Sequence, residues 1–359
     1  MGPNLPVDVV YVILGHLDTE DSIDRQTLGA CGLVCTEWTH PSRYYLFREV
    51  YLSDSNLELL LDLIETSPYH IISFVHLLVL SSAVVGGLLD QSIAKLGPLR
   101  LPNASDLLTC IPCDIFARHS SGLAQICPNL VRLTFAINTL PLERIFEVAR
   151  FFPSVGSICF RHCGFDHVQP PKNPLPVQRH ALALDMDRFF MQKFCHHVLP
   201  LRPIPVVSSL RLSGLLPEPT SAAGNYLRQV GVNLHYLEFC AQPGFSDDAL
   251  KYCTGLRHLV IRIYSISAEM LCFRILPHLR CPNLTTLTFG EIAPTSYLCS
   301  AEPLEKWRTV DEFLTHEHFP NLCTFTIASP WLFTQQLRHC MPLSVARGML
   351  HVIGVRLTG

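Results

Sequence analysis

Charged residues are scarce in this sequence. Asp, Glu, Lys and Arg make up only 16% of the 359 residues, whereas hydrophobic residues make up 48%. A chain with so few charges and so many apolar side chains belongs to the folded class of proteins, not to the disordered class. The formal net charge of -3 includes no basic surplus of the kind that nucleic-acid-binding surfaces carry. We therefore expect an ordered protein that does not bind nucleic acid.

Cysteine is too dilute for a disulfide-stapled scaffold, with 15 cysteines in 359 residues. The first residues, Met1 to Pro6, lack the basic and apolar regions of a secretory signal peptide. Pro6 also stands where a myristoylation motif requires Ser or Thr. We expect free thiols in a reducing compartment, which is the cytoplasm, the nucleus or both.

The short motifs of phosphate-binding and nucleophilic enzymes are also absent. G-x-x-x-x-G-K-[ST], G-x-G-x-x-G and G-x-S-x-G do not occur in the sequence. Soft metal ligands occur in three groups, none with the spacing of a standard zinc site. These groups are Cys110, Cys113, His119 and Cys127; Cys195, His196 and His197; and His316 and His318. We expect no enzymatic activity, no bound metal and no cofactor.

One uncharged run is long enough to raise the question of a membrane span. Ile71 to Leu89 contains no charged side chain, which is roughly the length that crosses a bilayer. The run also holds a histidine, several serines and two glycines, and no basic cluster flanks it as a topology signal. We favour a buried strand followed by a loop, and a membrane anchor is the alternative.

The N-terminal segment has the pattern of short amphipathic helices. Leu5, Val9, Ile13 and Leu17 are spaced four residues apart and make one continuous stripe, which Val10 and Leu14 widen. Pro6 is tolerated there because the first turn of a helix has no hydrogen bond to lose at that position. A polar run, residues 18–27, separates this stripe from a second apolar segment, residues 28–38. The pattern predicts three helices within residues 1–50.

These residues resemble an F-box. The resemblance rests on Leu5-Pro6, on Ile13 and Leu17, and on Leu33-Val34-Cys35-x-x-Trp38. The following residues, 42–48, are similar to the tail of that motif in the large fungal families of F-box proteins. The chain departs from the usual pattern in its polar insert, which carries four carboxylates and leaves the length of the second helix open.

The resemblance implies that the module docks on the Skp-family adaptor of cullin-RING ubiquitin ligases. Three short helices in fewer than about 50 residues bury too little apolar surface to be stable alone, so an interface is a natural support. The alternative is that their apolar residues pack on the rest of the chain. The residues expected to form or support the adaptor surface are Leu5, Pro6, Val9, Ile13, Leu17, Leu33, Val34 and Trp38.

A second pattern recurs along the rest of the chain. It reads apolar, x, x, apolar, x, apolar, and most successive copies start 22 to 28 residues apart. That period is close to the range of about 20 to 29 residues in leucine-rich repeats. The copies start at Phe74, Leu96, Leu130, Val155, Val207, Leu234, Leu256, Leu284, Leu322 and Leu350, and a degraded copy contains Leu182 and Leu184.

Several copies share a lead-in, in which Pro-Asn precedes the first strand leucine. Cys127, Cys281 and Phe319 each begin such a lead-in. Proline there ends a preceding helix and asparagine makes the turn into the strand. The regular asparagine ladder of such repeats is expected to be mostly missing. The pattern therefore predicts an irregular leucine-rich-repeat-like solenoid, with a curved parallel sheet and outer helices.

The expected fold class is α/β, and the chain divides into three parts. Residues 1–50 are the F-box-like module, residues 51–70 a connecting helix and residues 71–359 the solenoid. Residues between the buried strand positions face the other side of the sheet, because side chains alternate along a strand. Those expected to bind a target are Arg132, Arg161, Arg211, Tyr236, His258 and Arg262. Arginine forks suit carboxylates and phosphates, so an acidic or phosphorylated target is expected.

The favoured function is that of a substrate receptor in an F-box-containing (SCF-type) cullin-RING ubiquitin ligase. The helices would bind the Skp-family adaptor and, through it, the ligase, while the solenoid would bind an unknown protein target. The alternative is an interaction scaffold whose F-box binds the adaptor without delivering a target for ubiquitylation.

Overall fold

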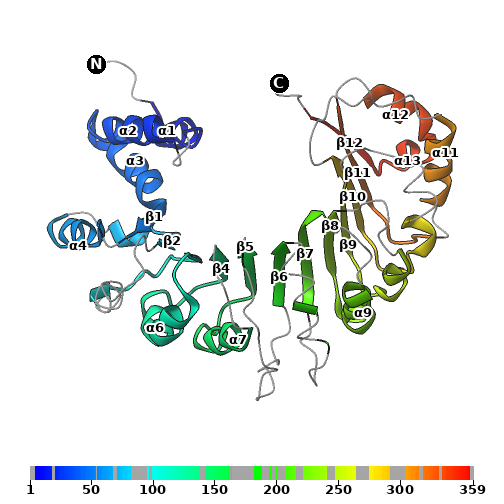
Figure 1. The fold of residues 1–359 in the computed structure, drawn as a ribbon. Helices are drawn as coiled ribbons and strands as arrows, with labels where there is room; N and C mark the ends of the chain where they lie inside the picture. The colour runs from blue at the N-terminus through cyan, green and yellow to red at the C-terminus, as the bar shows by residue number, and fades with distance from the viewer. Residues whose placement is uncertain are drawn as a thin grey trace. The chain divides into compact units, whose positions relative to one another are not determined.

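A computed structural model of the chain forms two compact units, Met1–His167 and Val168–Gly359 (Figure 1). Each unit is described by itself. The structure describes residues 5–17, 21–53, 55–67, 71–81, 95–96, 99–136, 142–161, 163, 182–187, 194–195, 199, 207–215, 221–240, 247–263, 275–291, 304–314, 318–330 and 334–355. The expected α/β class, with parallel strands and intervening helices, is confirmed in both units.

Three helices open the first unit, α1 (Val7–Leu14), α2 (Ser22–Cys31) and α3 (Thr36–Arg48). Their common core consists of Val10, Leu14 and Leu28, none of which is more than 1% exposed. Partly buried side chains packed around this core are Leu17, Cys31, Trp38, Tyr45 and Leu46. Val10 and Leu14 are therefore the residues of α1 that pack inwards. In the sequence pattern these two residues only widened the predicted apolar stripe, whose main members were Leu5, Val9, Ile13 and Leu17.

The helix α2 begins within the acidic, polar run of residues 18–27, which separates the two apolar segments of the module. Asp21 is the N-cap, and its side chain accepts a hydrogen bond from the Ile23 backbone N–H at 2.8 Å. Asp24 lies in the first turn, where the helix dipole favours a negative charge. The helix therefore begins at Ser22, inside the polar run, well before the apolar segment that the sequence pattern assigned to it.

The third helix runs into the sheet without a linker. α3 ends at Arg48 and β1 (Glu49–Leu52) begins at the next residue. The segment expected as a connecting helix, residues 51–70, holds the end of β1 and the helix α4 (Leu57–Thr66). Because β1 pairs with β2 (Leu77–Leu80), residues 49–66 belong to the sheet and its helices.

Five described strands form the parallel sheet of the first unit, in sequential order (Figure 1). After β1 and β2 they are β3 (Asp106–Thr109), β4 (Arg132–Ala136) and β5 (Ser157–Arg161). The helical segments are α4, η1 (Ile71–Phe74), α6 (Cys113–Ile126) and α7 (Leu142–Phe151). Figure 1 shows α6 and α7 on the same side of these strands.

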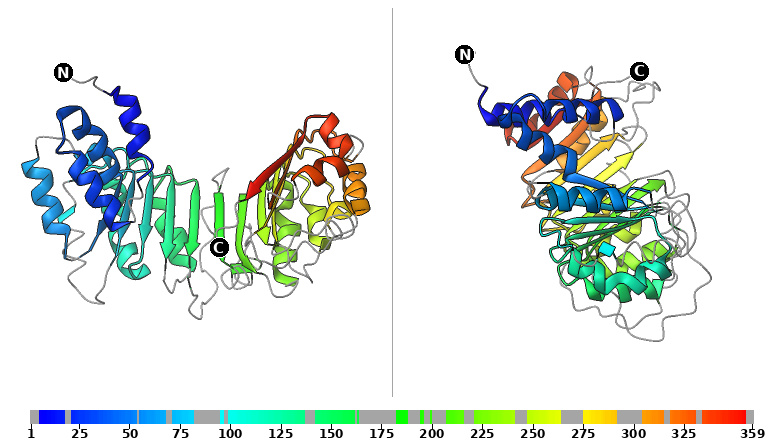
Figure 2. Two further views of the ribbon diagram at one scale, coloured as in Figure 1. Left: turned by 90° about the horizontal axis from the view of Figure 1, so that it is seen from above. Right: turned by 90° about the vertical axis from the view of Figure 1, so that its left-hand side faces the viewer.

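The second unit repeats this plan in sequential order (Figure 2). Its strands are β6 (Leu182–Asp187), β7 (Val207–Leu215), β8 (Tyr236–Cys240), β9 (His258–Ile263), β10 (Thr286–Glu291), β11 (Thr324–Pro330) and β12 (Leu350–Val355). Its helical segments are α9 (Ser221–Val230), η2 (Gly231–Asn233), η3 (Asp247–Tyr252), η5 (Leu276–His278), α11 (Leu304–Phe313), α12 (Thr334–Cys340) and α13 (Pro342–Ala346).

Seven copies of the sequence repeat have the register that their pattern predicts. The second and third apolar residues of each copy lie in a strand and are at most 3% exposed, as expected for positions that face the core. These copies correspond to β4, β5 and β7 to β11.

Three copies are placed differently. The first is one residue out of register, because Leu78 and Leu80, not Leu77 and Val79, align with the core positions of β3. The last is also shifted, since Ile353 is 56% exposed. The second forms no strand in its described residues, and β3 lies after it at residues 106–109.

With β3 at residues 106–109, the strands of the first unit are more evenly spaced along the chain than the sequence pattern suggests. Paired positions Glu49, Leu77, Asp106, Arg132 and Ser157 are 28, 29, 26 and 25 residues apart. The sequence pattern instead implied spacings of 22 and 34 around the second copy. The strand was missed because its core positions hold Leu107 and Thr109, and Thr109 does not count as apolar.

Three asparagines that follow a proline before a strand bind the preceding repeat, namely Asn129 and Asn321 of the predicted lead-ins and Asn103, which follows Pro102 before β3. Each amide donates to a backbone carbonyl one repeat earlier, so the turn into one strand is tied to the turn before it. The three bonds run from Asn103 to Ser73, from Asn129 to Pro102 and from Asn321 to Pro282, at 2.6, 2.8 and 2.8 Å. These asparagines precede their strands, so they are distinct from the asparagine ladder of regular leucine-rich repeats, whose asparagine follows the strand.

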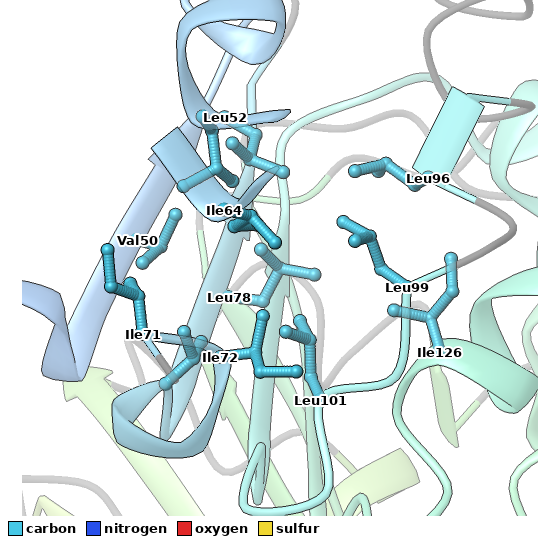
Figure 3. Close-up of a pocket in the computed structure, with 12 residues that line it drawn as sticks. Val50, Leu52, Ile64, Ile71, Ile72, Leu78, Leu96, Leu99, Leu101 and Ile126 are labelled. Carbon is cyan, nitrogen blue, oxygen red and sulfur yellow. The ribbon is translucent and has the colours of Figure 1, made fainter. Parts of the chain in front are cut away.

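A small apolar cavity lies between α4 and the first strands (Figure 3). Its volume is about 10 Å³, close to that of one water molecule. Figure 3 shows the side chains of Val50, Ile64, Leu78, Leu99 and Ile126 around it. Leu99, predicted to be a strand residue, instead lines this core from the loop before β3.

The uncharged run starting at Ile71 is a short 3-10 helix followed by a strand. Ile71–Phe74 forms η1 and Leu77–Leu80 forms β2, as the strand interpretation predicted. The remainder of the run, residues 82–89, lies outside the described residues. No helix in the described part of the chain has the length and apolar character needed to cross a bilayer.

We predict that Phe135→Ala strongly destabilises the first unit. Phe135 is fully buried and packs against Phe116 and Phe160, with ring centroids 5.6 and 6.0 Å away. Removing the ring should cost about 3 to 5 kcal/mol of unfolding free energy, measured by urea denaturation. Val131→Ala, at a position 52% exposed just before the same strand, should cost less than about 0.5 kcal/mol. Equal effects of the two substitutions would contradict the observed register.

Candidate functional site

The helix α1 is apolar except at Asp8 and Tyr11, but the chain covers only one side of it. Val10 and Leu14 are buried, whereas Val9 is 40% and Ile13 is 44% exposed. Leu5, just before the helix, is 48% exposed. A helix that is apolar nearly all round normally lies inside a protein, so the uncovered side of α1 has the character of an interface.

A second exposed apolar pair precedes α3. Leu33 is 88% exposed and Val34 is 67% exposed, both in the short turn between α2 and α3. Contiguous leucine and valine side chains this exposed are unusual on a surface that contacts only water.

Two of the residues expected at the adaptor surface contribute to the module's own core instead. Leu17 and Trp38 are partly buried against the cluster of Val10, Leu14 and Leu28. Pro6 is exposed and directly precedes α1 as its N-cap. The residues predicted for the adaptor surface thus fall into two groups, exposed side chains and partly buried side chains that pack in the core beneath them.

Three exposed apolar residues of the module were not predicted. Val7, Val12 and Ile23 are 47%, 64% and 69% exposed. The signal for Val7 and Val12 is present in the sequence, because α1 contains apolar residues beyond one stripe. Ile23 carries no such signal, since it stands alone in a polar run.

The residues expected to bind a target fall into two groups, one in each unit. Arg132 on β4 and Arg161 at the end of β5 belong to the first unit, and both are exposed. The other four belong to the second unit and lie on β7, β8 and β9. They are Arg211, Tyr236, His258 and Arg262.

In the first unit, Arg132 and Arg161 line a groove of about 310 Å³. Side chains from the end of α3 and from β1 to β5 line it as well, among them Tyr44, Arg48 and His76. These three were not among the predicted target-binding residues, since a repeat pattern cannot show that the end of α3 lies beside the strands.

In the second unit, the arginines surround a buried carboxylate. Glu238 on β8 is only 4% exposed. Arg211 donates from Nε to Glu238 Oε2 at 2.6 Å, and Arg262 donates from Nε to Oε1 at 2.5 Å. The Tyr236 hydroxyl donates to Oε2 at 2.6 Å, and Asp185 lies 3.9 Å from Arg211 Nη1. Two arginines and two carboxylates therefore balance each other in this group.

The hydrogen bonds to Glu238 set its charge state. Burial by itself raises the pKa of this carboxyl, but the hydrogen bond from Tyr236 and the two arginines outweigh burial and hold the pKa below its usual value. The pKa of Tyr236 is raised, first by burial and then by its bond to Glu238. The pKa of Arg211 is also raised, through its contacts with Tyr236 and Glu238. Glu238 is therefore ionised at neutral pH.

Most of the described cysteines are buried core residues, whereas Cys35 and Cys323 are exposed. Cys127, Cys253 and Cys281 are at most 2% exposed, and burial raises the pKa of each thiol to about 12. The Cys281 thiol donates to the Cys253 carbonyl at 3.0 Å, which links two repeats. Among the residues that the structure describes, no cluster of three or more His, Cys, Asp or Glu could hold a metal ion. His196, His197 and His316 lie outside those residues.

Comparison with known proteins assigns the chain to no family. No protein-family model matches it, and no curated protein sequence matches it. Any function is therefore inferred from the residues and their arrangement.

We predict that Glu238→Gln destabilises the second unit in a pH-dependent way. The substitution keeps the shape of the side chain but removes the charge that both arginines contact, which should cost about 1 to 3 kcal/mol at neutral pH. The unperturbed carboxyl titrates near 4.5 and the folded one lower. The stabilisation is therefore present above that pH and is lost as pH falls through the folded pKa. Urea unfolding at pH 7 and pH 3.5 should show a difference between variant and parent that shrinks in acid, and a pH-independent difference would contradict this role.

Proposed function

We propose that this chain is the substrate receptor of an SCF-type cullin-RING ubiquitin ligase. Its N-terminal helices act as an F-box that binds a Skp-family adaptor, and its leucine-rich-repeat-like solenoid binds a protein target. The chain itself catalyses no step. It brings a target lysine close to a charged ubiquitin carrier and so raises the effective concentration of the two reactants.

The observation that carries the proposal is the uncovered apolar surface of the N-terminal module. Leu5, Val9, Ile13, Leu33 and Val34 belong to the residues predicted to form the adaptor surface, and all five are at least 40% exposed. Burying one such side chain contributes about 1.5 to 3 kcal/mol. A partner that covers several of them gains enough apolar burial for a stable complex.

The junction between the module and the sheet supports an adaptor function. α3 continues directly into β1, and edge-to-face ring contacts reinforce the junction. The ring centroids of His40 and Phe74 are 5.0 Å apart, and those of Tyr44 and His76 are 5.9 Å apart. A rigid junction suits a protein that must hold a target at a defined distance from its ligase.

We predict that Leu33→Ser combined with Val34→Ser weakens binding to a recombinant Skp-family adaptor. Loss of two apolar anchors should raise the Kd at least about tenfold in isothermal titration calorimetry. Folding should be nearly unchanged because both side chains are largely exposed. Leu59→Ser, at a position of α4 that is 68% exposed, is the matched control and should leave binding intact. If the double variant binds as well as the parent chain, the F-box assignment is wrong.

The substrate-receptor function also predicts how a target behaves in cells. Proteins captured by the full chain should be compared with those captured by the double variant, with and without a proteasome inhibitor. A ligase target should accumulate and co-purify with the parent chain only when degradation is blocked. It should co-purify with the double variant with or without the inhibitor, because its ubiquitylation should require Leu33 and Val34. A partner whose level and ubiquitylation do not respond would favour the scaffold alternative.

A further inference from the structure

The groove of the first unit has an asymmetric distribution of charge. Its basic side chains are Arg48, His76, Arg132 and Arg161, and its acidic side chains are Glu49 and Asp106. The acidic side chains come from β1 and β3, whereas two of the arginines come from β4 and β5. The end of the groove formed by β4 and β5 is therefore its positive end.

The carboxylate nearest to the positive end, that of Asp106, already has an ion-pair partner and a hydrogen-bond donor. Asp106 Oδ1 lies 3.0 Å from Arg132 Nη1, and its Oδ2 accepts a hydrogen bond from the Ser105 hydroxyl at 2.6 Å. Through this contact Asp106 orients the Arg132 guanidinium, which keeps other N–H groups for a ligand. Asp106 thus positions one arginine without neutralising the second.

Arg161 is the second arginine at this end. It is exposed, and within the described residues no carboxylate forms an ion pair with it. Glu49 lies four strands away, which at ~4.8 Å per strand is about 19 Å. That separation exceeds the Debye length of ~8 Å at physiological ionic strength, so Glu49 does not offset the Arg161 charge.

The rest of the lining suits a peptide. Leu77 and Leu108 provide apolar contacts, and Ser105 and Thr134 provide hydroxyl groups. A groove of about 310 Å³ accommodates a few side chains of an extended segment. The arginines of the second unit do not offer the same opportunity, because Glu238 accepts a hydrogen bond from each of them.

We propose that this groove binds an extended peptide segment through one anionic side chain, a carboxylate or a phosphate, that pairs with Arg161. Arg132, at the start of β4, lines the groove further along, because the β4 residue paired with Arg161 is Ala136. The proposal deepens the proposed function, on which it rests for the identification of the segment as part of a target. Both anions accept two parallel hydrogen bonds from a guanidinium, which makes arginine their usual partner.

The test measures peptide binding to the purified full chain by fluorescence anisotropy. Three sets of labelled nonapeptides share randomised flanks and differ in the central residue, which is phosphoserine, glutamate or glutamine. At least one anionic set should bind about tenfold more tightly than the glutamine set at physiological salt, and the set that does so identifies the source of the charge. The preference should weaken at higher ionic strength.

The decisive variant is Arg161→Glu, with Arg280→Glu as its control. Both arginines are exposed, so each substitution reverses one surface charge and changes the net charge equally. Arg161→Glu should remove the preference for the anionic set, and Arg280→Glu should retain it. Equal binding of all three sets, or an anionic preference that survives Arg161→Glu, would overturn the proposal.

Adaptor binding, measured on the same preparations, separates this proposal from the proposed function. Arg161→Glu should bind the Skp-family adaptor as the parent chain does, because Arg161 lies on β5 and not on the N-terminal helices. A chain that binds anionic peptides but no adaptor would disprove the F-box function and leave the groove assignment intact.

Discussion

Contact between neighbouring repeats is the constraint on which each unit depends. A single strand with its helix cannot bury its own apolar residues, so every repeat completes its core against the next one. Phe135 and Phe160 illustrate this dependence, because they come from successive strands and their rings stack with centroids 6.0 Å apart. The polar lead-ins also contribute to the contact between repeats, because the Asn129 side-chain amide donates a hydrogen bond to a backbone carbonyl of the preceding repeat.

Inter-repeat packing also explains how much of the fold could be predicted from the sequence. The strands with leucine, isoleucine or phenylalanine at both core sites, β4, β5 and β7 to β11, were predicted in the correct register. β3 was missed because Thr109 occupies a core site, and the apolar residues Leu99 and Leu101 in the loop before it imitate the repeat pattern. The shifted first copy has another cause: every residue of Leu77–Leu80 is apolar, and a uniform run does not reveal which side faces inwards.

The candidate site was less predictable, because charge depends on partners that come from other repeats. Alternation along the strands correctly placed Arg211 and Arg262 on the face opposite the core. It could not show that Glu238, on the strand between them, accepts a hydrogen bond from each arginine. Nor could it show that Arg132 forms an ion pair with Asp106, whereas no carboxylate among the described residues pairs with Arg161. Arginines at similar positions of different repeats thus have different ionic partners, and the side chains of the neighbouring strands determine those partners.

Helix α3 connects the exposed apolar surface of the N-terminal module with the groove of the first unit. Trp38, near its beginning, packs on the core that supports the exposed residues of α1, and Arg48, at its end, lines the groove. Tyr45 donates a hydrogen bond to the Tyr11 carbonyl of α1 at 3.0 Å, so the middle of α3 is tied to that helix as well. Because the helix passes into β1 without a linker, the groove lies at a fixed distance from the apolar surface of the module. Under the proposed function, this junction would restrict a bound target to a few positions and so raise its effective concentration at the ligase, whereas a flexible connection would let it sample many.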